Sequence, residues 1–188
     1  MIIRYLVFCV LLMLLSSCGM PRSTVIDGIP IQSKDVPELD YFDTICWQLQ
    51  VRNYLYCSSK GLMAKNGDVT YHFNFVTRNL YDLSEARLVT LELVEDLWRM
   101  MLDNQNMGPK MKQIALTNPE VLRDRFVIFI HCIDRKGNYV KPLKIALCGF
   151  ADGKFNYSII DKASQQQQMV YSETYAEACA FRDSQRKS

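Results

Sequence analysis

Apolar residues are concentrated at the start of this chain, and this limits how much of the 188-residue sequence can enter one folded core. Of the first 18 residues, 15 are apolar, and residues 5–15 form an uncharged run. Removing them from the roughly 92 apolar residues leaves about 45% over the rest, a value typical of a globular domain. The run is shorter than the roughly 20 apolar residues of a membrane-spanning helix. We therefore expect the domain to fold without this segment.

The residues that flank the apolar run are those of a secretory signal peptide. Arg4 precedes the run, and the small residues Ser16 and Ser17 follow it. A positive start, an apolar core of about 7 to 15 residues and small residues at the exit are typical of segments that are removed on export. We predict that residues 1–17 are a signal peptide.

The end of this segment, Leu15-Ser16-Ser17-Cys18, resembles the lipobox of bacterial lipoproteins. The resemblance implies that diacylglycerol is attached to the Cys18 sulfur, that the bond before Cys18 is cut, and that the new amino group is acylated. Two or three acyl chains hold a protein on a bilayer, whereas one binds marginally. Two other interpretations stay open: a cleaved signal with a cysteine nearby by chance, and an uncleaved hydrophobic start.

The residues after Cys18 suggest where the protein is held. The residue directly after Cys18 is Gly19, and not Asp. By analogy with the sorting rule known for some Gram-negative bacteria, this residue favours the outer membrane, with the domain facing the periplasm or the cell surface. Residues 18–40 contain three prolines and no sustained hydrophobic period, so we predict a lipidated cysteine followed by a flexible tether. Residues 41–188 then form a single domain.

The charge balance limits the classes of binding partner that the protein can have. The chain has 22 Lys and Arg against 20 Asp and Glu, a formal net charge of +2, which excludes the electrostatic footprint of a nucleic-acid-binding protein. No cluster of basic residues adjoins Cys18, so the lipid alone would attach the protein to the membrane. We expect the partners to be the membrane, through Cys18, and an envelope protein of unknown identity.

Hydrophobic periodicity predicts helices and strands from Leu39 onward. A helix fits Leu39 to Ser59, although alternating apolar residues there also fit a strand. Alternation after an Asn-Gly turn predicts a strand over Asp68 to Arg78. The strongest helix is Leu83 to Asp103, because Asp82 and Glu85 form a capping box. A short turn of helix fits at Asn118-Pro119.

The second half of the chain is predicted to form a β-meander followed by a helix. We predict strands over Arg125 to Asp134, Leu143 to Ala151 and Lys154 to Ile160, the last two joined by the hairpin signal Asp152-Gly153. A polar loop follows at Gln165 to Gln168 and a helix at Tyr171 to Arg182. These elements predict an α+β fold, with about four antiparallel strands in one sheet and helices packed on one face.

The central residues support this fold through a second resemblance. The region from Glu85 to Tyr157 resembles small uncharacterised lipoproteins of intracellular Gram-negative bacteria. The resemblance lies in the helix start Glu85-Ala86-Arg87 and in the hairpin from Asp134 to Gly153. The resemblance implies no activity.

Five cysteines remain once Cys9 leaves with the signal and Cys18 carries lipid, and export places them where disulfides form. They are Cys46, Cys57, Cys132, Cys148 and Cys179. In one continuous helix the Cα atoms of Cys46 and Cys57 would lie about 16 Å apart, beyond the roughly 7 Å that a disulfide allows, so their pairing requires the strand alternative or a break in the helix. The expected strand register places Cys132 and Cys148 on opposite faces. We expect most of the five to be isolated core thiols, and the odd number leaves at least one unpaired within the chain.

Catalytic and metal-binding motifs are not found in the sequence. The two histidines, His72 and His131, lie on predicted strands and lack the spacing of a zinc site. A nucleophilic pair of His72 with Cys132 or Cys148 stays open, but accidental combinations of this kind are common. The acidic residues of the long helix are explained by a solvated edge; they are Glu92, Asp96 and Asp103. We expect no catalytic residue, cofactor or metal.

Two functions fit these observations. The first is a non-enzymatic, membrane-anchored lipoprotein of the cell envelope that acts through protein contacts. The alternative is a carrier of an apolar small molecule or lipid, in which Trp98, Met100 and Met101 cover a cavity against the sheet.

Overall fold

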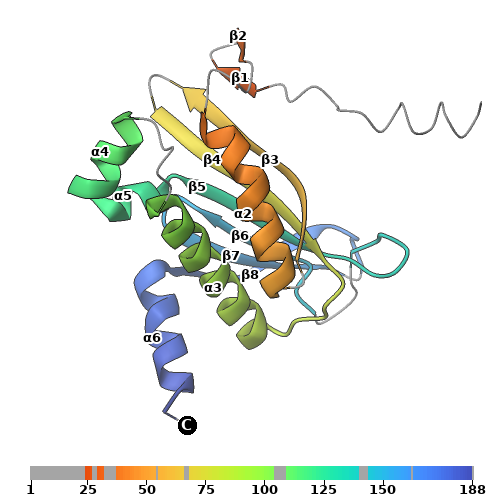
Figure 1. Cartoon of the computed structure of the whole chain (residues 1–188). Helices are drawn as coiled ribbons and strands as arrows, with labels where there is room; N and C mark the ends of the chain where they lie inside the picture. The colour runs from red at the N-terminus through yellow and green to blue at the C-terminus, as the bar shows by residue number, and fades with distance from the viewer. Residues whose placement is uncertain are drawn as a thin grey trace, which may run out of the picture.

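The chain folds into one mixed β-sheet with helices packed against it (Figure 1). This computed structural model describes residues 24–26, 29–31, 37–53, 55–65, 68–103, 109–139, 144–161 and 163–187. The elements in chain order are β1 (Thr24–Ile26), β2 (Ile29–Ile31), α2 (Pro37–Asn53), β3 (Tyr56–Lys65), β4 (Asp68–Thr77), α3 (Leu83–Leu102), α4 (Pro109–Thr117), α5 (Pro119–Asp124), β5 (Phe126–Cys132), β6 (Leu147–Ala151), β7 (Lys154–Ile160), β8 (Gln167–Thr174) and α6 (Tyr175–Gln185). The predicted α+β class is confirmed.

The sheet is larger than the predicted four antiparallel strands. Its order is β2-β1-β3-β4-β5-β6-β7-β8, with six main strands from β3 to β8 and two three-residue strands at one edge. The prediction was also wrong in direction, because β4 pairs with β5 in parallel and β1 pairs with β3 in parallel. The chain crosses from β4 to β5 through α3, α4 and α5, and a long helical connection of this kind returns a strand in the same direction.

One face of the sheet carries the core. Buried residues alternate along β4 and β5, with Tyr71, Phe73 and Phe75 beside Phe126 and Ile128. This alternation points one side of each strand toward α2 and α3, which lie across the same face in Figure 1. Residues of the opposite set are half-buried or exposed; they include His72, Asn74, Val127, Phe129 and His131. We refer to this second side as the open face.

The helix expected over Leu39 to Ser59 is shorter, and it ends at Asn53. Its buried side consists of Phe42, Ile45, Cys46 and Leu49, which is helical spacing. The alternative of a strand is wrong, since it would bury Trp47, whose exposure is 66%. The last residues of the predicted helix instead begin β3, which pairs antiparallel with β4.

Local signals placed α3 and the β6–β7 hairpin correctly. The Asp82 carboxylate caps α3 by accepting a hydrogen bond from the Glu85 amide, and the Glu85 carboxylate accepts one from the Asp82 amide, at 2.9 Å each. In the hairpin, Asp152 and Gly153 have φ angles of 50° and 72°, and Ala151 pairs with Lys154 across the turn. These positive angles favour the Asp-Gly sequence that predicted the turn.

The N-terminal segments of the prediction lie largely outside this description. The predicted signal peptide, residues 1–17, and the lipidation site Cys18 lie outside the described residues. Within the predicted tether, residues 18–40, the structure places β1, β2 and the first residues of α2. No helix among the described residues is long and apolar enough to cross a membrane.

Candidate functional site

The strand at the far edge of the sheet, β8, is the candidate site. It pairs with β7 on one side, and no strand of the described residues pairs with its other side. Residues Gln167 to Val170 are exposed, and Met169 and Val170 expose 61% and 43% of their surface. The loop predicted over Gln165 to Gln168 is shorter, because Gln167 already belongs to the strand. We refer to Gln167–Val170 as the free half of β8.

The free half of β8 has little of the usual protection of an edge strand. Natural edge strands avoid pairing with other chains by carrying lysine or other charges, by proline, or by bulges. Residues 165–172 contain no charge and no proline. The register skips Val170 between the Tyr157–Tyr171 and Ser158–Met169 pairs, so a bulge lies at the last residue of the free half. The bulge is therefore the one such device in the free half.

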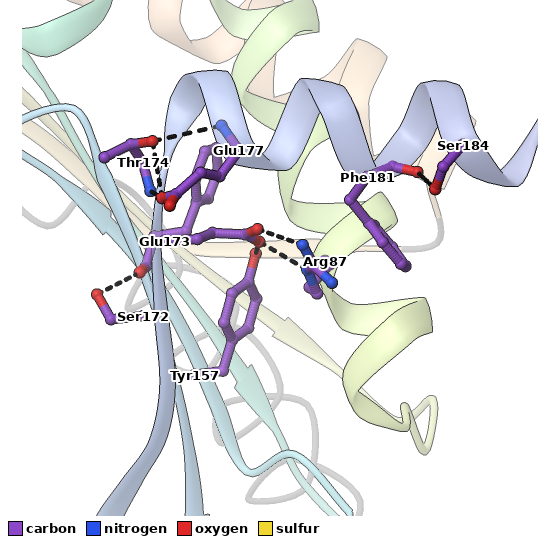
Figure 2. A network of polar contacts seen from close by, with 9 residues as sticks. Arg87, Tyr157, Ser172, Glu173, Thr174, Glu177, Phe181 and Ser184 are labelled. Atoms are coloured by element: carbon purple, nitrogen blue, oxygen red, sulfur yellow. Dashed lines mark hydrogen bonds and ion pairs between the residues drawn. The ribbon is translucent and has the colours of Figure 1, made fainter.

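The other half of β8 is tied to the core by a buried ion pair. The carboxylate of Glu173 accepts hydrogen bonds from Arg87 of α3, at 2.9 Å from Nε and 2.5 Å from a terminal nitrogen. The Tyr157 hydroxyl donates a third, at 3.2 Å. Figure 2 shows these three side chains converging between β7, β8 and α3. The Glu173 side chain is fully buried and that of Arg87 is 14% exposed, so water contributes little to this network.

Aromatic rings complete the surroundings of Arg87. Its guanidinium carbon lies 3.6 Å from the centre of the Phe181 ring of α6 and 4.9 Å from that of Tyr171. Burial alone would lower the pKa of Arg87, but the hydrogen bonds and charge of Glu173 outweigh it and hold the pKa above its usual value. Burial, followed by the charge of Glu173, raises the pKa of Tyr157, which keeps its hydroxyl protonated as a donor.

Helix α6 begins directly after β8 and fixes the end of the strand. Thr174 and Glu177 form a capping box, in which Glu177 accepts a hydrogen bond from the Thr174 amide at 2.7 Å (Figure 2). Farther along α6, Arg182 binds both oxygens of Glu95 of α3 at 2.6 and 2.8 Å. The helix therefore starts at Tyr175, not at the predicted Tyr171. The arrangement holds β8 rigidly at one end and leaves its free half in solvent.

The structure does not bring the predicted histidine and cysteine candidates together. His72 lies on the open face, where its ring nitrogen is 3.0 Å from the Thr70 hydroxyl, and His131 bonds the Tyr139 hydroxyl at 2.7 Å. Burial lowers the pKa of both histidines. Cys132 and Cys148 belong to the buried set on the core face. The sheet therefore separates them from both histidines.

One expectation about the cysteines was wrong. Cys148 pairs with Ile130, two residues before Cys132, so Cys132 and Cys148 share the core face instead of lying on opposite faces. Cys46 and Cys57 do not lie in one continuous helix: α2 ends at Asn53, and this break lets their sulfur atoms lie 2.7 Å from each other. Cys179 is half-buried on α6.

The acidic residues of α3 show no convergence on a site. Asp96 pairs with Arg99 at 3.0 Å, while Glu92 and Asp103 are exposed. Among the described residues, no group of three or more His, Cys, Asp or Glu side chains is placed to hold a metal ion. The sequence patterns did not predict Glu173 or its pairing with Arg87, which entered only through the resemblance at residues 85–87. The pattern Thr174-x-x-Glu177 was a usable signal for the start of α6, and hence for the end of β8.

Comparison with known proteins gives no relative. No family model, curated protein or solved structure matches this chain.

Proposed function

We propose that this protein is a non-enzymatic lipoprotein of the cell envelope, held on the outer membrane by lipid on Cys18, and that it acts by binding another envelope protein. The anchor is inferred from the lipobox at Leu15 to Cys18. The observation that carries the binding role is the free half of β8, an uncharged edge strand in solvent. The domain would face the periplasm or the cell surface.

The partner that this edge fits is an extended peptide segment. A strand added beside β8 would satisfy main-chain N–H and C=O groups that have no partner strand among the described residues. The exposed side chains of Met169 and Val170 would then give apolar contacts, and the glutamines would give hydrogen bonds without imposing a charge requirement. The Glu173–Arg87 pair supports this role because it keeps the strand extended before the partner arrives.

The anchor is tested by a Cys18→Ser variant in cells of a Gram-negative host. We expect the wild-type chain to fractionate with membranes and to incorporate labelled fatty acid, and the variant to lose both. A Cys179→Ser variant serves as the matched control, because its cysteine lies in α6 of the folded domain. Membrane association and lipid labelling that survive the loss of Cys18 would contradict the anchor.

The binding role is tested by photo-crosslinking in the intact envelope. A photoreactive residue replaces Gln168 in the free half of β8, and in a control chain it replaces Leu116 of α4, which is 86% exposed. We expect an adduct of one defined mass from position 168 only. Adding Met169→Lys should reduce it about tenfold, since a charge on the edge opposes strand addition. No adduct at position 168, or an equal adduct at position 116, would contradict the proposal.

The carrier alternative depends on α3. Met100 and Met101 lie in the core cluster that packs α3 against the sheet, and Trp98 borders it. These positions are accounted for by core packing, so we do not develop the carrier role.

A further inference from the structure

Cys46 of α2 and Cys57 of β3 are two free thiols in direct contact. Their Sγ atoms lie 2.7 Å apart, about 0.7 Å beyond the roughly 2.05 Å length of a disulfide bond. The two residues are 11 positions apart, and the break after Asn53 lets the chain turn back so that β3 runs beside α2. A covalent bond between them would therefore need only a small movement of two side chains.

The two thiols differ in their access to solvent. Cys46 is 5% exposed and packs with the core, whereas Cys57 is half-buried at the start of β3. The Cys57 sulfur also lies 3.6 Å from the Ser59 carbonyl oxygen, in an exposed setting. A reagent in solution would reach Cys57 first.

The neighbouring charges favour Cys57 as the nucleophile. Lys60 follows Cys57 on the core face of β3 and forms an ion pair with Asp43, one turn before Cys46 on α2. The hydrogen bond from the Cys46 thiol lowers the pKa of Cys57, and the positive charge of Lys60 lowers it further against the opposing effect of burial. The same hydrogen bond, together with burial, raises the pKa of Cys46. Of the two thiols, Cys57 therefore ionises first, while Cys46 keeps its proton.

We propose that Cys46 and Cys57 are a thiol–disulfide exchange site, with Cys57 as the attacking thiol, Cys46 as the resolving thiol and an intramolecular disulfide as the product. The co-reactant is a disulfide, either of a small molecule or of a protein. The Cys57 thiolate attacks one of its sulfur atoms, forms a mixed disulfide and releases the other half as a thiolate. Cys46 then loses its proton to that thiolate and attacks the Cys57 sulfur. The new S–S bond forms, the second half leaves as a thiolate, and the donor disulfide is reduced by two electrons.

The remaining cysteines provide internal controls. Cys132 and Cys148 are at most 1% exposed on adjacent strands, so they resemble the proposed pair in proximity but not in access. Cys179 is half-buried like Cys57 but is not paired with another cysteine in the described part of the chain. Proximity and access occur together only at Cys46 and Cys57 among these five.

The test is peptide mapping of the full chain after incubation with oxidised glutathione. The protein is incubated at neutral pH, acid-quenched, alkylated and cut with trypsin. Cleavage after Lys34, Arg52 and Lys60 separates the pair, so the disulfide appears as residues 35–52 joined to residues 53–60. We expect this linked species to be the main oxidised product. Residues 126–135 joined to residues 145–154 would report Cys132 and Cys148, and we expect this product only after unfolding in urea.

Two variants distinguish the roles of the thiols. Cys46→Ser should trap one glutathione on Cys57, because the resolving thiol is missing. Cys57→Ser should give neither adduct nor link at Cys46, because the buried thiol is not reached. Cys132→Ser is the matched control, and it should leave the link between residues 35–52 and 53–60 intact. Circular dichroism confirms that each variant is folded.

Three results would overturn the proposal. The first is a folded wild-type chain that gives no linked 35–52 and 53–60 peptides. The second is a glutathione adduct that forms on Cys179 as fast as on Cys57. The third is a folded Cys46→Ser variant that accumulates no adduct on Cys57. None of these results depends on Cys18 or β8, so failure here is distinct from failure of the proposed function.

Discussion

Replacing Arg87 with methionine isolates the energetic role of the buried ion pair. The Arg87→Met substitution keeps a long unbranched side chain beside Phe181 but removes the guanidinium that satisfies both carboxylate oxygens of Glu173. Glu173 then keeps one donor, the Tyr157 hydroxyl, in a site where its side chain has no exposed surface. The variant therefore leaves the buried negative charge of Glu173 without its positively charged partner.

The expected loss of stability follows from that burial. Breaking a buried ion pair by removing one partner costs about 3–5 kcal/mol, a large part of the roughly 5–15 kcal/mol that stabilises a typical domain. With a urea dependence of about 2 kcal/mol per molar, the unfolding midpoint should fall by about 2 M. The matched control is Arg99→Met, because Arg99 is 65% exposed beside Asp96. That change should cost less than about 1 kcal/mol.

A double variant identifies the unpaired carboxylate as the cause. Replacing Glu173 with leucine as well removes the buried charge that has lost its partner, so Arg87→Met/Glu173→Leu should recover most of the loss.

The assay is equilibrium urea unfolding of the full chain in mild detergent at neutral pH, monitored by tryptophan fluorescence. A loss below about 1 kcal/mol for Arg87→Met would refute the reasoning. A loss that the added Glu173→Leu substitution leaves unchanged would also refute it. That result would assign the effect to the packing of Arg87 against Phe181 and Tyr171.

Three further predictions concern the core, a helix cap and the histidines. Phe73→Ala should cost about 3–5 kcal/mol in urea unfolding, because the ring is fully buried among other aromatic residues; Tyr56→Ala, at a position 59% exposed on the neighbouring strand, should cost far less. Asp82→Ala removes the acceptor for the first turn of α3 and should cost about 0.5–2 kcal/mol, with faster amide exchange confined to that turn. Burial lowers the pKa of His72 and His131, so the unfolded chain binds protons first and stability should fall as the pH drops below about 6.5. A His72→Gln/His131→Gln variant should lose less stability than the wild type between pH of about 7.5 and 5.5, and an equal loss would contradict this assignment.

Short-range patterns predicted the parts of the fold whose partners lie nearby in the chain. The capping box at Asp82 and Glu85 fixed the start of α3, because both hydrogen bonds close within three residues. The Asp152-Gly153 turn joined β6 to β7, because its backbone angles suit those two residue types. Alternation along residues 68–78 marked β4 because one side of it faces the core.

Long-range contacts determined the features that sequence patterns missed. Residues 54–59 fit a helix on local spacing, yet β3 gains a ladder of hydrogen bonds with β4, and this pairing ends α2 early. The same competition turns Gln167 and Gln168 from a loop into strand, because β7 supplies partners for their backbone groups. Propensity over a few residues is weaker than a strand pairing that the whole sheet supports.

The predicted lipidation at Cys18 and the candidate site on β8 therefore come from different levels of the molecule. The resemblance to a lipobox lies in the linear sequence of residues 15–18, so the expectation of a lipid anchor needs no folded structure. Glu173, in contrast, meets Arg87 across 86 positions of sequence, and Cys57 meets Cys46 only once α2 ends and β3 turns back. No local periodicity encodes such distances, because the partner of each side chain is set by strand order, register and the packing of α3 on the sheet.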